Sequence, residues 1–291
     1  MEVNDDPSQS PVRAAATVVM LRDGEAGLEV FLVKRHGLSD VLGGAYVFPG
    51  GKVDRDDAHL DVDAHLDLSA AAMRAALDET DLDETAAAAL HVAACREAFE
   101  ESGVLFAHDA GAEAAAQAWE LLREGRAFDE VLAMMRLRLQ ASLLQPWSRW
   151  ITPAVGGVMR KRFDTRFFLA QVPAGQVARH DEREATESVW LAPRAALEQY
   201  WNRTIELAPP QIMSLAHLAR HTSVQGAFAE ARMRKPPLIH PEPFEDQGIR
   251  VICYPGDERH SVTERALPGP TRLHYRERRF EPAGGFEALF E

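Results

Sequence analysis

Hydrophobic and polar positions alternate with a short period at the start of the chain. Residues 14–22 and 28–35 are rich in apolar and β-branched side chains, and they flank the turn-forming sequence Asp23-Gly24-Glu25. This arrangement predicts an opening β-hairpin. The residues before it are polar and acidic, so we expect residues 1–12 to form a disordered tail.

The apolar spacing then changes to that of helices. Residues 69–102 are rich in Ala, Leu, Glu and Arg and are interrupted at 78–84. The pattern predicts one short helix and then a second over about 85–102, with Gly103 as its end. Two more helices are predicted, over 112–124 and 127–144.

Strand-like segments return in the second half of the chain, and they are predicted over 151–159, 166–172 and 187–191. Pro193 and Pro209 each begin a predicted helix, because proline is favoured in the first helical turn. Two further strands are predicted over 249–254 and 273–280, and they could form a small hairpin. The mixture predicts an α/β fold.

Composition narrows the possible functions. A chain of 291 residues with 46% hydrophobic residues suits one large or two small domains, and no apolar run approaches the ~18 residues needed to span a bilayer. Two isolated cysteines, Cys95 and Cys253, do not make a disulfide framework, so we expect a soluble protein of the reducing cytoplasm. The net charge of -13 argues against nucleic acid as the main partner.

An acidic cluster ends the second predicted helix. With Glu97 set at 0° on a helical wheel, Glu100 lies at about 300° and Glu101 at about 40°, so the three carboxylates share one face. They repel one another and crowd the negative end of the helix, and a hard divalent cation would relieve that repulsion. The alternative is an ordinary solvated acidic face, which is common in acidic proteins.

A second element lies upstream, where Gly50-Gly51-Lys52-Val53-Asp54 follows Phe48-Pro49. Together with the run from Arg96 to Val104 it resembles the Nudix box: Gly, five residues, Glu, seven residues, then Arg-Glu-apolar-x-Glu-Glu-x-Gly-apolar. The second half matches at every fixed position. Gly51 takes the glycine position, and Asp57 stands where the family has glutamate.

The spacer of the box is much longer than the family pattern. Residues 58–95 make 38 positions where the pattern has seven, so we expect a helical insertion over about 58–88 that loops out of the box. Such an insertion is tolerable because the cost of closing a loop grows only slowly with its length. A similarly interrupted box is found in the branch that includes the peroxisomal coenzyme A diphosphatase, which residues 161–168 and 187–193 also resemble.

The resemblance implies an α/β/α sandwich around a mixed sheet, with a Nudix hydrolase domain over 13–235 and a C-terminal extension, 236–291, packed on it. By the same resemblance Mg²⁺ or Mn²⁺ is bound by Glu97, Glu100, Glu101 and the carbonyl of Gly51. Glu100 is either a third ligand or the group that orients the attacking water. Arg96 would brace the box loop through a carboxylate.

The reaction implied is attack of water on one phosphorus of a diphosphate, with the cation activating the water. The general base would be a helix glutamate or an acid within 180–184. Coenzyme A or an acyl-CoA is the first candidate substrate, and ADP-ribose, NADH and dinucleotides stay open, as does a nucleotide-binding sensor without catalysis. Arg35 and Arg162 are the candidate substrate-binding residues, and the resemblance is compatible with a homodimer.

Overall fold

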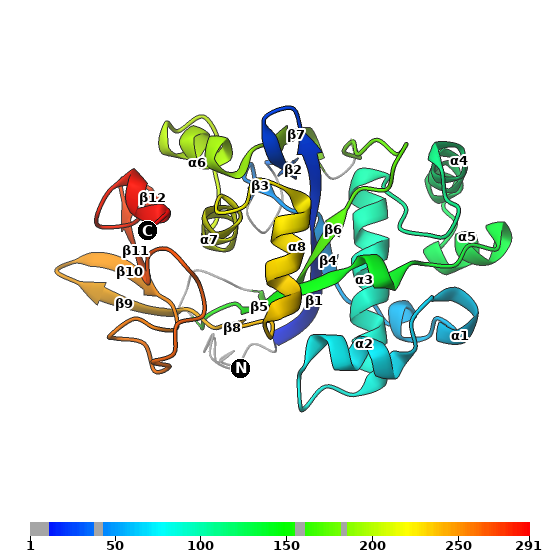
Figure 1. Ribbon diagram of the computed structural model, residues 1–291, viewed down its shortest axis with the longest axis horizontal. Helices are drawn as coiled ribbons and strands as arrows, with labels where there is room; N and C mark the ends of the chain where they lie inside the picture. The colour runs from blue at the N-terminus through cyan, green and yellow to red at the C-terminus, as the bar shows by residue number, and fades with distance from the viewer. Residues whose placement is uncertain (1–11, 38–42, 155–160, 182–184) are drawn as a thin grey trace, which may run out of the picture.

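The computed structural model describes residues 12–37, 43–154, 161–181 and 185–291. The tail predicted over 1–12 therefore lies outside the described residues except for Val12. Figure 1 shows a central sheet with helices on both faces and a smaller sheet at one end. In these ranges no helix combines the length and the hydrophobicity needed to cross a membrane.

The central sheet is mixed, as predicted. Its strand order is β3-β2-β1-β6-β5-β8 in the described ranges, with β4 paired to β1 and β7 to β2. β1 runs parallel to β6, from Val12 beside Arg162 to Leu21 beside Gln171, and β5 runs parallel to β8. The strands are β1 (Val12–Gly24), β2 (Gly27–Arg35), β3 (Tyr46–Val47), β4 (Gly50–Lys52), β5 (Gln145–Ile151), β6 (Arg162–Gln171), β7 (Ala185–Leu191) and β8 (Leu238–Ile239).

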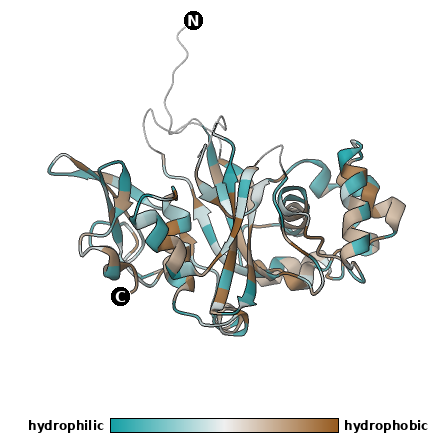
Figure 2. Cartoon of the chain, turned by 90° about the horizontal axis from the view of Figure 1, so that it is seen from above, coloured by the Kyte–Doolittle hydropathy of each residue, from teal (hydrophilic) through white to brown (hydrophobic). Residues whose placement is uncertain are grey.

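Both faces of this sheet are covered, which explains why its inner strands are apolar on both sides. Along β1, Val18 and Met20 belong to the core on the α3 side, and Val19 and Leu21 to the core on the opposite side. Figure 2 shows hydrophobic segments on the sheet strands and on the helices that flank them. The result is the predicted α/β/α sandwich.

The helices divide between the two faces (Figure 1). α2 and α3 pack on one face, with α4 and α5 beyond them, and α6, α7 and α8 lie on the other. They are α1 (Val62–His65), α2 (Ala70–Leu77), α3 (Glu84–Ser102), α4 (Ala112–Arg123), α5 (Phe128–Met135), α6 (Pro193–Trp201), α7 (Pro209–Leu218) and α8 (Val224–Met233).

α3 is the central helix of its face, and its ends are fixed by the local sequence. Asp83 caps its start by accepting a hydrogen bond from the Ala86 N–H at 2.7 Å. Gly103 ends it in the left-handed conformation, with φ of 69°, and donates its N–H to the Phe99 carbonyl. The alanine-rich first half of α3 packs closely on the sheet because its side chains are small.

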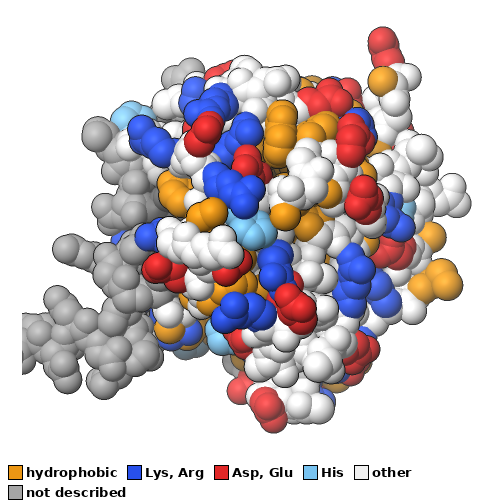
Figure 3. All heavy atoms as spheres, turned by 90° about the vertical axis from the view of Figure 1, so that its left-hand side faces the viewer, with side chains coloured by type: hydrophobic (Ala, Val, Ile, Leu, Met, Phe, Trp, Pro, Cys, Tyr) orange, Lys and Arg blue, Asp and Glu red, His pale blue; other side chains and the backbone are white. Residues whose placement is uncertain are grey.

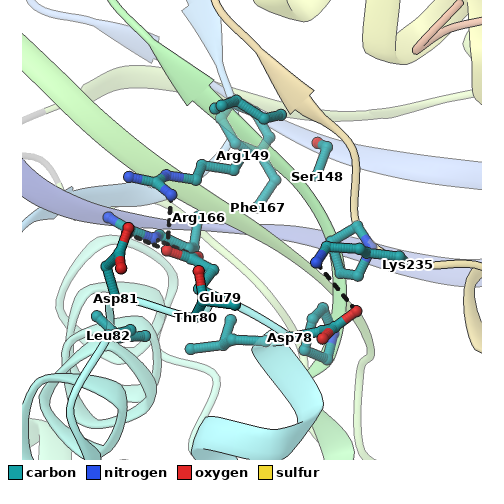
Figure 4. A pocket seen from close by; sticks show the side chains of 14 residues that line it. Asp78, Glu79, Thr80, Asp81, Leu82, Ser148, Arg149, Arg166, Phe167 and Lys235 are labelled. Carbon is teal, nitrogen blue, oxygen red and sulfur yellow. Dashed lines mark hydrogen bonds and ion pairs between the residues drawn. The ribbon is translucent and has the colours of Figure 1, made fainter. Parts of the chain in front are cut away.

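The insertion folds back onto the sheet. α1 and α2 lie within it, so the short helix expected there is confirmed. After α2, the Glu79 carboxylate accepts hydrogen bonds from Arg166 Nε and Nη2 at 2.9 and 2.6 Å, and it lies 2.8 Å from Arg149 Nη1 (Figure 4). A cavity of about 280 Å³ opens beside this cluster. Glu79 therefore connects the insertion to β5 and β6.

Two predicted elements need correction, and one helix was not predicted. The helix predicted over 127–144 ends at Met135, because Arg136 adopts a left-handed conformation with φ of 53°. The strand predicted over 151–159 lies earlier, at β5, which accommodates Pro146 opposite Phe168 at an irregular register; residues 155–160 lie outside the described ranges. α8 was not predicted, since its ten residues carry only a weak apolar pattern.

Residues 236–291, all of them described, contain a four-stranded antiparallel sheet where a hairpin was predicted. Its order is β12-β11-β10-β9. The hydroxyl of Tyr200 in α6 joins it to the sandwich, donating to the Phe280 carbonyl at 3.0 Å and accepting from the Phe280 N–H at 2.8 Å. The strands are β9 (Glu242–Asp246), β10 (Ile249–Cys253), β11 (Arg272–Arg276) and β12 (Arg279–Glu281).

Figure 3 shows the end of the molecule that carries this second sheet. Basic, acidic and hydrophobic side chains are intermingled on it, and several of the cations are paired, as Arg194 is with Glu287 and Arg203 with Glu277. This face is therefore not a continuous basic patch of the kind that binds nucleic acid.

Candidate active site

The glycine-rich segment and the acidic end of α3 lie against each other. β4 pairs with β1, with Gly51 beside Ala16. From the segment, the Gly50 N–H donates to Glu101 Oε2 at 3.0 Å, and the Lys52 carbonyl accepts from Arg96 Nη2 at 3.0 Å. The two halves of the box, separated in sequence by the insertion, are thus adjacent in the fold.

Arg96 joins the halves through Asp57. Its Nε and Nη2 donate to the two carboxylate oxygens of Asp57 at 2.8 and 2.9 Å, which is the bidentate geometry that suits a guanidinium. Asp57 is buried and also accepts a hydrogen bond from the Asp54 N–H at 2.7 Å. Aspartate at the family's glutamate position therefore reaches Arg96 and holds the loop.

The same guanidinium also contacts two of the acids. Arg96 Nη1 lies 2.8 Å from Glu97 Oε1 and 3.0 Å from Glu100 Oε2. Burial alone would lower the pKa of Arg96, but its hydrogen bonds to Asp57 and the charges of Glu97, Asp57 and Glu100 outweigh burial and raise the pKa. Arg96 is therefore a permanent cation that partly offsets the repulsion within the cluster.

The three glutamates differ in exposure. The side chain of Glu97 is 12% exposed and that of Glu100 is 39% exposed, and Glu101 is buried. The alternative interpretation, a solvated acidic face, is wrong for Glu97 and Glu101, because the segment from Gly50 to Asp57 covers them. Carboxylates are seldom buried unless something compensates their charge.

The two glycines allow this close approach. Gly50 has φ of 155°, and a Cβ there would lie 2.4 Å from the Ala16 carbonyl oxygen. A Cβ on Gly51 would lie 2.6 Å from the carboxylate oxygens of Glu97. The carboxylate of Glu97 therefore lies directly against the backbone at Gly51. In their chemistry, carboxylate and carbonyl oxygens are the donors that Mg²⁺ and Mn²⁺ prefer.

The segment before β7 meets the end of α3. The N–H groups of Arg179 and Asp181 donate to the carbonyls of Ser102 and Glu101 at 3.0 and 3.3 Å, and so satisfy carbonyls that the helix end leaves open. This brings Asp181 beside the acidic cluster. The other acids predicted in this loop, Glu182 and Glu184, lie outside the described residues.

The two candidate substrate-binding arginines lie in different places. Arg35 ends β2, on the edge that leads through β3 to the box segment, and its Nε is buried without a hydrogen-bond partner among the described residues. Arg162 begins β6, and its Nε donates to the Thr152 carbonyl at 3.2 Å. β6 and β4 pair with opposite edges of β1, so two strand spacings, about 10 Å, separate them.

Other residues noted in the sequence are structural. Cys95 is a buried free thiol on the apolar side of α3, as its helical position predicts, and Cys253 is also buried and free. Sequence reasoning missed the Gly50 N–H as a contact of Glu101. The adjacent glycines were the available signal, since such a pair permits close approach of backbone to a side chain.

Comparison with known proteins agrees with the box. Residues 10–218 match the family model described as the NUDT19 Nudix domain. The chain is 28% identical over 232 residues to the acyl-coenzyme A diphosphatase NUDT19 of Xenopus laevis. That match covers 67% of this chain but 61% of the frog protein, so the chain spans less than two thirds of that relative's length.

Two further relatives extend the comparison. A putative nudix hydrolase 7 of Caenorhabditis elegans is 26% identical over 268 residues, covering 89% of this chain and 78% of that protein. The crystal structure of a NUDIX hydrolase from Alicyclobacillus acidocaldarius aligns with a TM-score of 0.60 at 27% identity, covering 76% of this chain and 97% of the other. With the family model matching most of its length, this chain belongs to the Nudix hydrolase superfamily, in the NUDT19 Nudix domain family.

Proposed function

We propose that this protein hydrolyses the diphosphate linkage of a nucleoside diphosphate derivative, with coenzyme A or an acyl-CoA as the first candidate substrate. The observation that carries the proposal is the burial of Glu97 and Glu101 against Gly50 and Gly51. The substrate candidate rests on the similarity to the Xenopus laevis relative, which is named an acyl-coenzyme A diphosphatase.

The proposal includes Mg²⁺ or Mn²⁺ held by Glu97, Glu100, Glu101 and the carbonyl of Gly51. Oxygen donors, the close approach of Glu97 to Gly51 and the excess of acids over the single Arg96 all support this assignment. When bound, such a cation lowers the pKa of water and offsets the charge of the diphosphate.

The chain's own residues would divide the remaining work. Arg96 is engaged by Asp57, Lys52, Glu97 and Glu100, so we assign it to positioning and not to contact with substrate. The Gly50 N–H fixes the orientation of the Glu101 carboxylate. We assign Glu100, the most exposed of the three acids, to orienting the water and taking its proton, with Asp181 as the alternative base.

Recognition of the substrate is assigned first to Arg35. Its Nε is buried and lacks a partner among the described residues, so a phosphate oxygen would have to displace neighbouring groups to supply one. Arg162 would reach a part of the substrate distant from the diphosphate, because β1 separates it from the box segment.

Two alternatives keep the same site. ADP-ribose, NADH or a dinucleotide could supply the diphosphate, since the box residues would act on that group and not on the rest of the molecule. The second alternative is a nucleotide-binding sensor without catalysis. The one sequence feature that favours it is Asp57, which stands where the family has glutamate. The bidentate pair of Asp57 with Arg96 supports an intact box and so favours the enzyme.

The test is product analysis of the full chain with Mg²⁺ or Mn²⁺ against coenzyme A, an acyl-CoA, ADP-ribose, NADH and diadenosine polyphosphates. Cleavage of coenzyme A to 4′-phosphopantetheine and 3′,5′-ADP, abolished by Glu101→Gln, is the expected result. Preference for another diphosphate would keep the reaction and change the substrate. Nucleotide binding without turnover on any of them would overturn the proposal in favour of a sensor.

A further inference from the structure

A second group of potential metal ligands lies between α7 and α8, on the sheet face opposite α3. The Nε2 atoms of His217 and His221 lie 2.6 and 2.8 Å from the two carboxylate oxygens of Glu230. One ligand atom from each of the three residues falls within 4.8 Å of the others. The group is separate from the box, which is built on α3.

Local structure brings these side chains together. His217 and His221 are four residues apart, and the helical turn continues past α7, because the His221 N–H donates to the Leu218 carbonyl at 3.0 Å. Both imidazoles therefore point to one side. Ser223 then caps α8 by accepting from the Gly226 N–H, and α8 packs so that Glu230 meets both imidazoles.

The hydrogen bonds of this cluster are incomplete. Arg234 Nε donates to Glu230 Oε1 at 3.2 Å, while Arg234 Nη2 and His217 Nδ1 are buried without a partner among the described residues. Buried polar groups usually have partners, and unsatisfied ones often mark the place of a water molecule or an ion. Arg234 is at present the cation that faces Glu230.

We propose that His217, His221 and Glu230 bind a transition-metal ion of the Zn²⁺ class, through two imidazole nitrogens and one carboxylate oxygen. Imidazole suits Zn²⁺ and its neighbours, whereas the all-oxygen box suits Mg²⁺ or Mn²⁺. Arg234 would leave Glu230 when the ion binds. It can do so because it is the capping residue at the end of α8 and its side chain is 25% exposed.

The ion would join α7 to α8 and so stabilise the helical layer behind the sheet. Binding to the folded state alone raises the melting temperature in proportion to the logarithm of the free ion concentration. For a chain of this size we expect a rise of about 5 °C at roughly 100 times the dissociation constant. Hydrolysis at the box does not depend on this ion.

The test is titration of the full chain with Co²⁺ after treatment with a chelator. Four-coordinate Co²⁺ with nitrogen ligands absorbs visible light far more strongly than six-coordinate Co²⁺ bound by oxygen, so the two sites are distinguishable. We expect one equivalent of strongly absorbing Co²⁺, displaced by Zn²⁺. The band should be lost in His221→Gln and Glu230→Gln but kept in Glu97→Gln, which alters only the box.

Arg234→Gln provides a second, opposite test, because removal of the competing cation should tighten Co²⁺ binding at least several-fold. Melting curves in chelator check that each variant is folded. The proposal fails if neither the unaltered chain nor Arg234→Gln develops the band. It also fails if the band persists in a folded His221→Gln variant or disappears in Glu97→Gln.

Discussion

Asp57 and Arg96 are 39 positions apart in the sequence and form a bidentate ion pair at 2.8 and 2.9 Å. The pair closes the base of the insertion, because the inserted residues leave the box after Asp57 and return to it before Arg96. The Asp57 side chain is 2% exposed. The contact therefore fixes the box segment against α3, and it compensates the charge of the buried Asp57 carboxylate.

Removal of one partner should be costly. Asp57→Ala leaves Arg96 largely buried with fewer partners, and breaking such a pair typically costs 3–5 kcal/mol, which denaturant unfolding would measure. Replacement of both residues, as in Asp57→Leu with Arg96→Met, should recover only part of that stability and no hydrolysis, because Glu97 and Glu100 then lose the cation that offsets their repulsion. Equal stability of Asp57→Ala and the unaltered chain would contradict the importance assigned to the pair.

The two adjacent glycines should respond differently to alanine. Gly50→Ala forces a Cβ against the Ala16 carbonyl at a φ of 155°, so we expect loss of stability and poor folding. Gly51→Ala meets only the end of the Glu97 side chain, so the protein should fold normally while activity falls and the metal concentration needed rises. Gly37→Ala, with open space among the described residues, is the control. Similar melting temperatures for Gly50→Ala and Gly37→Ala would show this account to be wrong.

Substitution of the acids separates charge from fold. Glu97→Gln and Glu101→Gln keep the side-chain volume and should lower kcat/KM on the order of 100-fold or more, because a metal ligand is weakened. The exposed Glu84, at the start of the same helix, provides the control Glu84→Gln, which should keep full activity. Steady-state kinetics at saturating Mg²⁺ measures kcat/KM of all three variants. If Glu84→Gln lowered kcat/KM as much as the other two substitutions, the assignment of Glu97 and Glu101 to the site would be wrong.

Glu79 should contribute much more to stability than its neighbour. Glu79→Gln removes the charge that faces Arg166, which is 6% exposed, and Arg149, so we expect a loss of about 2–4 kcal/mol. Asp78→Asn breaks the exposed pair with Lys235 at 3.2 Å and should change stability by less than about 1 kcal/mol. Thermal or urea unfolding measures the stability of both variants. A smaller loss of stability in Glu79→Gln than in Asp78→Asn would refute the expectation.

Stability should fall with acid because of His91. Burial lowers the pKa of His91 from 6.5 to about 4, although its hydrogen bond to the Ala87 carbonyl and the charge of Asp67 act in the opposite direction. Between those values the unfolded chain binds more protons than the folded chain, so stability decreases as pH falls from 6.5 towards 4. The full effect is about 3 kcal/mol.

His91→Leu removes this titration and should flatten the dependence of unfolding free energy on pH in that window. The measurement is made in chelator, so that no metal ion at His217 adds a pH dependence of its own. Burial also lowers the pKa of His217 to about 4, so a smaller slope from that residue should persist in the variant. An unchanged slope in His91→Leu would show that His91 is not the source.

Local periodicity was enough to predict the helices and strands whose own apolar pattern matches the face that they bury in the fold. The hairpin of β1 and β2, the long α3 and the proline-started α6 and α7 lie close to the predicted ranges. The reversal after α5 depends on Arg136 in a left-handed conformation, which composition does not signal outside glycine and asparagine. The predicted helix therefore ran on past the point where the chain turns.

The candidate site shows the same limit. A helical wheel places Glu97, Glu100 and Glu101 on one face but does not say what covers that face. The cover comes from Gly50 to Asp57, and its contacts depend on pairing between β4 and β1. The division of the chain at residues 235 and 236 stays a prediction. The His217 cluster gave no sequence signal, because Glu230 lies on a helix that was not predicted.

The parallel pairing of β1 with β6 has a consequence for synthesis of the chain. One edge of β1 receives β2 and β4 early, but the other waits for Arg162–Gln171. At ribosomal rates of about 5–20 residues per second, the roughly 140 residues between the partners take roughly 7 to 30 s to appear. The box is complete only once Val104 has been made, and until β6 follows, one edge of β1 stays open to pairing with other chains.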